Sequence, residues 1–231
     1  MQWSYIEKMI RLNSFVGSLY LNRQDIVLLE SREIPASTFL RLQNTYHLSL
    51  IHSLLYTNCA LELLEEKVLR IFSLGRISQE FDLIDEEFFK KLTIACVSNV
   101  VREIITRTRI HIDSRFGRNM FGVVDEYAVL EYGEVFVQYS VVQQDRIKEG
   151  ERKTTFHVLT GPVVLTKNPC HHPGDLRIFQ AVVRPELYTM VDVIVFPQKG
   201  PRPHSNEISG SDLDGNEKEN KGIFLFDDLL I

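Results

Sequence analysis

Apolar residues recur at helical spacing over residues 35–72. The positions fall three, four or seven residues apart and comprise Leu50, Leu54, Leu61, Leu64, Val68 and Phe72. This spacing places them on one face of a helix, and core packing is the expected role of that face. Pro35 suits the first turn of this helix, and Gly75 is a natural stop.

A second helix is predicted to begin near residues 85–87, where three consecutive acids suit the positive end of a helix dipole. Its apolar stripe comprises Phe89, Leu92, Cys96, Val100 and Ile104. Arginines fall in its last turns, where the dipole favours cations. The chain is therefore expected to be helical from residue 35 to about residue 115.

Short β-rich runs replace this pattern after Gly117. Gly, Pro, Asn and Asp separate the runs, which lie at residues 121–124, 129–130, 134–142, 156–159, 163–166, 178–183 and 191–196. Regularly spaced short strands with turn signals are typical of a small barrel or a sandwich. The expected fold class is α+β, with a helical N-terminal half followed by a barrel-like C-terminal half.

Composition narrows the class of protein. A chain of 231 residues with 44% hydrophobic content can form a real core. Cys59, Cys96 and Cys170 lie far apart, which favours reduced thiols over a disulfide framework or a zinc site.

We see no signal-peptide pattern and no apolar run of membrane-spanning length, and we expect an intracellular protein, cytoplasmic or nuclear. No GxSxG elbow, Walker loop or GxGxxG fingerprint supports another catalytic class.

The run at residues 209–216 carries the clearest chemistry. Asp212 and Asp214 lie one residue apart on a glycine turn, so both carboxylates can bind one hard cation, as in Mg²⁺-dependent phosphoryl transfer. A calcium-binding EF-hand loop starting at Asp212 would need glycine and glutamate where Glu217 and Ile223 stand, which excludes that site. By spacing alone, an exposed acidic turn without a catalytic role is equally favoured.

Two nearby segments present cations. Lys167 follows a predicted strand within the Pro/Gly-rich stretch 161–175, and its ammonium suits a phosphate or a ribose hydroxyl. Lys199 and Arg202 lie in the proline-rich stretch 196–204, a rigid lead-in to the acidic run, and suit an anionic substrate. The alternatives are an ordinary surface lysine and a proline-stiffened surface connection.

Together, these segments resemble the cellular RNA-dependent RNA polymerase family of eukaryotic RNA silencing. The matching stretches are residues 20–29, 117–126, 130–138, 161–175, 191–203 and 209–215. The resemblance implies double-psi β-barrels joined by helices. It divides the chain into three parts. Residues 1–34 would be the end of a preceding barrel or connector, and residues 35–115 a helical linker region. Residues 116–231 would form a second double-psi β-barrel that is incomplete at its C-terminus.

The resemblance also implies roles for particular residues. Asp212 and Asp214 would hold Mg²⁺, and Lys167 with Asn168 would approach the ribose of the incoming nucleotide. Family members carry a third aspartate where this chain has Asn216, a weaker and uncharged ligand. The apolar strand expected after the acids would resume only at residues 223–226.

Three readings of the function follow. The first is an RNA-directed RNA polymerase that uses an RNA template and nucleoside triphosphates, with RNA-silencing proteins as further partners and this chain as a fragment of its catalytic core. The second is a catalytically impaired relative that binds RNA or a silencing partner. Asp212, Asp214 and Lys167 favour the first hypothesis. Asn216 and the shortened C-terminal end favour the second, and a truncated gene product remains a third reading.

Overall fold

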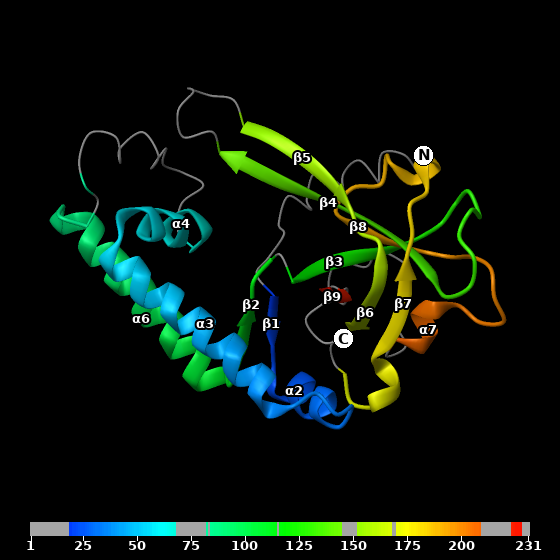
Figure 1. Cartoon of the computed structure of the whole chain (residues 1–231), viewed down its shortest axis with the longest axis horizontal. Coiled ribbons are helices and arrows are strands. Elements are labelled where there is room, and N and C mark those ends of the chain that lie inside the picture. Colours follow the sequence, from blue (N-terminus) through cyan, green and yellow to red (C-terminus); the bar gives the residue numbers. More distant parts are fainter. Residues whose placement is uncertain are drawn as a thin grey trace.

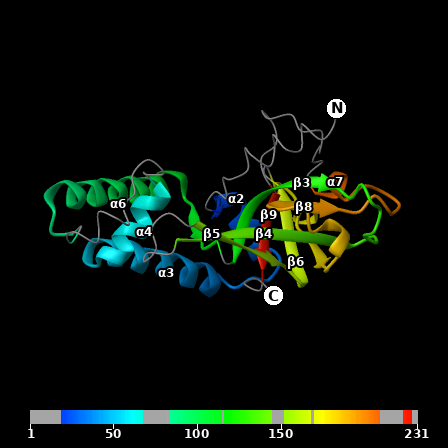
Figure 2. The ribbon, with the colours of Figure 1, turned by 90° about the horizontal axis from the view of Figure 1, so that it is seen from above.

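The protein is described by a computed structural model over residues 19–67, 82, 84–114, 116–144, 152–167, 170–208 and 223–227. Helices gather at one end of the molecule and a curled sheet at the other, with a small two-stranded sheet between them (Figure 1). The view from above shows the same separation of helices and sheet (Figure 2). The mixed helix-and-sheet class expected from the sequence is confirmed.

The helical end contains α3 (Ala36–Leu55), α4 (Thr57–Lys67) and α6 (Glu87–Arg107). The helix predicted from residue 35 is present, but it is interrupted at Tyr56, whose extended backbone ends α3. Helix α6 begins where the acids predicted it, because the Glu86 carboxylate accepts the Phe89 N–H at 2.9 Å as an N-cap. No helix in the described part of the chain is long and apolar enough to cross a bilayer.

The predicted apolar stripes hold these helices together. Leu50 of α3, Leu63 of α4 and Val100 of α6 share one buried cluster. Leu64 of α4 packs in a second cluster against Leu92 of α6. The stripe of α6 therefore serves core packing, as expected from its spacing, and so do Leu50, Leu61 and Leu64 of the first stripe. Leu54 is exposed instead. Val68, Phe72 and the predicted stop at Gly75 lie outside the described residues.

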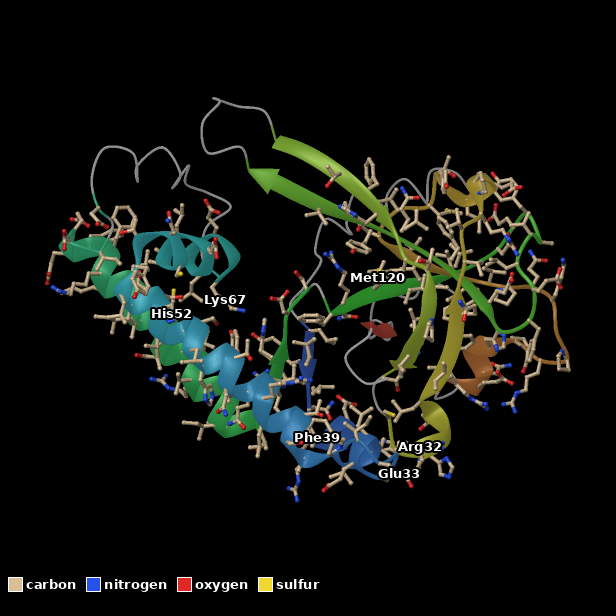
Figure 3. The ribbon with its side chains drawn as sticks, in the orientation of Figure 1. Arg32, Glu33, Phe39, His52, Lys67 and Met120 are labelled. Atoms are coloured by element: carbon tan, nitrogen blue, oxygen red, sulfur yellow. The ribbon has the colours of Figure 1, made fainter. Side chains whose placement is uncertain are left out.

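A two-stranded sheet joins the helices to the curled sheet. Strand β1 (Leu19–Leu21) pairs antiparallel with β2 (Ile110–Ile112), and helix α2 (Arg23–Glu30) follows β1. The prediction of helix up to about residue 115 is therefore wrong at its end, because α6 stops at Arg107 and residues 110–112 pair with β1. Phe39 of α3 packs with the buried residues of both strands (Figure 3). Val164, from the curled sheet, belongs to the same cluster, so one apolar cluster fixes the helices against the sheet.

The curled sheet contains β3 (Gly117–Val124), β4 (Glu134–Gln144), β5 (Arg152–Val158), β6 (Gly161–Lys167), β7 (Arg177–Ala181), β8 (Val193–Phe196) and β9 (Ile223–Asp227). Their order is β5-β4-β7-β6-β9-β3-β8, and β8 also pairs with β4, so the strand order returns on itself. The β3–β8 and β4–β7 pairs are parallel. Strand β5 forms a hairpin with β4 that projects from the rest of the sheet (Figure 1).

Alternate residues of the strands fill the interior of the curled sheet. The buried cluster comprises Met120, Val135, Val137, Val163, Leu165, Phe179, Ala181, Ile194, Phe196 and Ile208. Within each strand the buried residues of this cluster are two positions apart, because successive side chains of a strand point to opposite faces of the sheet. Met120 marks this interior in Figure 3, and a cluster around Phe136 and Val195 covers the opposite face.

Most predicted strands are present, but the strand predicted at residues 129–130 is wrong. These residues lie in a turn between β3 and β4. The fully buried Asp125 carboxylate accepts the N–H of Tyr127 at 3.0 Å and of Leu130 at 2.8 Å. A side chain that bonds nearby backbone donors in this way competes with strand pairing. The apolar run at residues 223–226, by contrast, does form a strand, β9.

Replacing Leu165 with alanine should lower the free energy of unfolding by about 2–5 kcal/mol, because removal of a fully buried leucine side chain leaves a cavity. Ile178→Ala on the neighbouring strand β7 is the matched control, since Ile178 is 70% exposed. The control should cost less than about 1 kcal/mol. Urea denaturation followed by circular dichroism measures both, and equal losses would contradict the assignment of interior and exterior faces.

Replacing Asp125 with alanine should cost about 1–3 kcal/mol, because the buried Leu130 N–H would lose its acceptor. Asp125→Asn keeps one acceptor oxygen and should cost less. Thermal and urea unfolding of the two variants test this order. An Asp125→Ala variant as stable as the wild type would show that the carboxylate does not hold the turn.

Candidate catalytic metal site

The predicted metal ligands Asp212, Asp214 and Asn216 lie outside the described residues, as does Asn168. The structure gives the two ends of the segment that carries the acids. In the described ranges, no three His, Cys, Asp or Glu side chains gather as a metal-binding group. The candidate site is therefore built from what fixes the entry to this segment and the exit from it.

The exit from the acidic segment lies beside Lys167. Ile223 begins β9, and the register of β6 with β9 makes Ile223 the Cα partner of Lys167. The Lys167 side chain is partly buried at the end of β6. Backbone pairing in the sheet thus brings the predicted nucleotide-contacting lysine to the point where the chain returns from the acids.

The turn that follows Lys167 is fixed at its base. Thr166 is fully buried, and its hydroxyl donates to the sulfur of Cys170 at 3.1 Å. Burial raises the pKa of the Cys170 thiol, which therefore stays protonated at neutral pH. This contact joins the two sides of the turn and holds the end of β6 in place.

The far side of the same turn is held by a carboxylate and an arginine. Asp175 accepts the backbone N–H groups of His171 and His172 at 3.1 and 2.9 Å. Arg32, which follows α2, donates to the Pro173 carbonyl at 2.7 Å (Figure 3). The turn that presents Lys167 is thus tied to an element distant in the sequence.

The two predicted cations of the lead-in, residues 196–204, both have protein partners. Lys199 forms an ion pair with Glu131, with Nζ and Oε1 2.5 Å apart, and its side chain is 44% exposed. Arg202 donates from Nη2 to the Asn206 carbonyl at 3.1 Å. Both side chains therefore lie on the segment that enters the acidic run, Lys199 held by a contact across 68 residues and Arg202 by a local one.

A hydrogen-bonded group fixes the end of the lead-in to the turn before β4. His204, at the start of α7 (His204–Glu207), is 4% exposed, and its Nε2 accepts the Gly133 N–H at 2.9 Å. Because a backbone amide can only donate, Nε2 is unprotonated, and Nδ1 donates to Glu207 at 2.7 Å. The other oxygen of Glu207 accepts the Tyr132 hydroxyl at 2.9 Å. We call Tyr132, His204 and Glu207 the entry clasp.

Ring packing reinforces the entry clasp. His204 stacks on Tyr132 with ring centroids 4.2 Å apart and meets Phe179 edge-on at 4.8 Å. Gly200, with φ +130°, brings its backbone against the Tyr132 ring, where a Cβ would lie 2.2 Å from a ring carbon. Only glycine allows both this backbone angle and this approach.

Hydrogen bonds keep the clasp carboxylate ionised. Burial raises the pKa of Glu207, but the bonds from His204 and Tyr132 outweigh burial, and the pKa lies below its usual range. The bond to Glu207 raises the pKa of the Tyr132 phenol. The clasp therefore holds one carboxylate that accepts two hydrogen bonds from different elements.

The sequence did not reveal the entry clasp. His204 and Glu207 follow Pro203 and are three residues apart, a spacing that predicts a helical turn in which the two side chains are neighbours. Their partner Tyr132 is 75 residues from Glu207, and no spacing pattern connects them.

Comparisons with known proteins match this chain to one family. The family model described as RNA dependent RNA polymerase matches residues 6–218. The chain is 56% identical over 114 residues to RNA-dependent RNA polymerase 1 of Arabidopsis thaliana, over 49% of this chain and 9% of the relative. It is 37% identical over 205 residues to RNA-dependent RNA polymerase 6 of the same plant, over 85% of this chain and 17% of the relative.

A solved structure shares the fold. The RNA dependent RNA polymerase QDE-1 from Thielavia terrestris matches 93% of this chain with a TM-score of 0.67 at 22% identity, over 25% of its own length. This chain thus spans a quarter or less of each protein compared here. Because the family match covers nearly the whole sequence, the chain belongs to the cellular, RNA-silencing-type RNA-dependent RNA polymerase family.

Proposed function

We propose that this chain forms part of the catalytic core of an RNA-directed RNA polymerase, which adds nucleotides to an RNA 3′-hydroxyl on an RNA template. The family match carries this proposal, because it extends through Asp212, Asp214 and Asn216. The register that pairs Lys167 with Ile223 supports it, since it sets a cation at the exit from the acidic segment.

We propose that the curled sheet is the second double-psi β-barrel of this core. The strand order that returns on itself, with parallel β3–β8 and β4–β7 pairs, supports this assignment. Residues 1–34 would then end the preceding barrel or connector, and residues 35–115 would link the two barrels. The pairing of β1 with β2 supports this division, because it brings the chain before the helical region next to the chain after it.

The donor set suits a Mg²⁺ ion. Asp212 and Asp214 supply two carboxylates and Asn216 an amide oxygen, all of them the hard oxygen ligands that this cation prefers. A bound Mg²⁺ supplies the charge that makes the RNA 3′-hydroxyl more acidic and offsets negative charge on the transferring phosphoryl group. The two aspartates hold and orient this centre.

The cations around the acidic segment bind the substrates. Lys167 presents its ammonium to the ribose or a phosphate of the incoming nucleotide, with Asn168 beside it in the sequence. Lys199 and Arg202 offset the charge of RNA along the lead-in. Lys199 can exchange Glu131 for a phosphate, because an exposed ion pair contributes at most about 1 kcal/mol.

Asn216 weakens the proposed centre. A neutral amide in place of a carboxylate removes one negative charge from the ligand set, and charge interactions at ligand distances amount to several kcal/mol. A rate loss on the order of a thousandfold follows, since each ~1.4 kcal/mol changes a rate tenfold. Asn216 is also what favours the second candidate, a catalytically impaired relative that binds RNA or a silencing partner.

A chimera tests the proposal, because the chain spans 17% of RNA-dependent RNA polymerase 6 of Arabidopsis. The matching segment of that protein is replaced by this sequence, and nucleotide incorporation is measured on single-stranded RNA with Mg²⁺. Asn216→Asp should raise incorporation on the order of a thousandfold. In that background, Asp212→Ala or Asp214→Ala should abolish it.

Asn220→Asp is the matched control, because it makes the same chemical change outside the proposed ligand set. It should leave incorporation unchanged. Equal gains from Asn216→Asp and Asn220→Asp would contradict the assigned ligand set. A chimera that melts like its parent but stays inactive with Asn216→Asp would favour the non-catalytic alternative.

A further inference from the structure

The entry clasp lies directly before the acidic segment. Glu207 precedes Asp212 by five residues, and Ile208, between them, is fully buried in the interior of the curled sheet. One residue advances the chain by at most about 3.6 Å, so the place where residue 208 is fixed limits where the acids reach. The clasp and Ile208 together set that place.

The contacts of the clasp leave little freedom for its side chains. Both ring nitrogens of His204 are bonded, and both oxygens of Glu207 accept hydrogen bonds from different partners. Rotation of either side chain would break at least one of these bonds, and a buried polar group without its partner costs about 1–3 kcal/mol. The clasp therefore holds one orientation.

Helix α7 cannot supply this rigidity by itself. It spans the four residues His204–Glu207, and isolated helices of that length do not form in water. Its geometry is imposed by Tyr132 and Gly133, which belong to the turn before β4. The clasp thus ties the entry of the acidic segment to the curled sheet.

We propose that Tyr132, His204 and Glu207 are positioning residues that set how Asp212 and Asp214 meet at the divalent cation. This inference rests on the proposed metal-binding role of the two acids. The clasp acts through the backbone around Ile208 and supplies no ligand itself. Ligand geometry must be held to within about 0.5 Å, so a loosened entry should weaken cation binding without unfolding the protein.

The primary measurement is the Mn²⁺ affinity of the 231-residue chain. Electron paramagnetic resonance gives this affinity from the concentration of free Mn²⁺. Glu207→Ala and His204→Phe should each weaken binding about tenfold, the lower end of the range for residues that support metal ligands. Tyr132→Phe removes one hydrogen bond but keeps the ring, and should weaken binding less. Tyr188→Phe is the matched control, because both tyrosines are 46% exposed, and it should leave affinity unchanged.

Conservative variants separate hydrogen bonding from bulk. His204→Gln keeps an acceptor for Gly133, and Glu207→Gln keeps one acceptor oxygen, so each should recover part of the affinity lost in His204→Phe or Glu207→Ala. Tyr132→Phe added to Glu207→Ala should cause no further loss, because the hydroxyl has already lost its partner. Fully additive losses from these two changes would contradict the clasp.

Thermal unfolding and Asp212→Ala complete the test. If Tyr132→Phe or Glu207→Gln binds Mn²⁺ more weakly while its melting temperature is unchanged, the positioning role of the clasp is supported. If affinity falls only in variants whose melting temperature falls in proportion, the positioning role is wrong. If Asp212→Ala removes binding while Glu207→Ala and His204→Phe keep wild-type affinity, the clasp proposal alone is wrong. If Asp212→Ala binds Mn²⁺ as the wild type does, the proposed metal site is wrong, and the clasp proposal falls with it.

Discussion

The pairing of β9 with its two neighbours determines the geometry of the proposed site. Strand β9 pairs antiparallel with β3 on one side and with β6 on the other. Without it, β3 and β6 would each present an unpaired edge, and the strand order would no longer return on itself. Because β9 follows the acidic segment directly, closing the sheet also sets where that segment ends, next to Lys167.

The entry to the acidic segment is fixed by side-chain chemistry instead of strand pairing. The entry clasp joins α7 to the turn before β4, and Ile208 is buried in the core of the same sheet. In the sequence, the acids thus lie between two segments that are both anchored to the curled sheet. Fixing both ends of a loop restricts its conformations, which favours a cation site whose ligands must be held in place.

Strong local patterns made much of this fold predictable. The acids and apolar stripe of α6 marked its start and its buried face, and the apolar runs in β6 and β8 marked central strands. Two misses have physical causes. The break at Tyr56 has no glycine or proline to announce it, and the apolar residues 129–130 form a turn because buried Asp125 captures nearby N–H groups. The proposed acids could be chosen from spacing and resemblance, whereas the clasp depends on a contact across 75 residues.

The position of Mn²⁺ in a crystal of this chain, located by anomalous scattering, tests the proposed site most directly. We expect an ion bound by both Asp212 and Asp214, on the side of the sheet where Lys167 pairs with Ile223. The entry clasp should be intact in the same crystal. An ion bound elsewhere, or Asp212 and Asp214 carboxylates that share no ion, would show that the two anchored ends do not bring these acids to one cation.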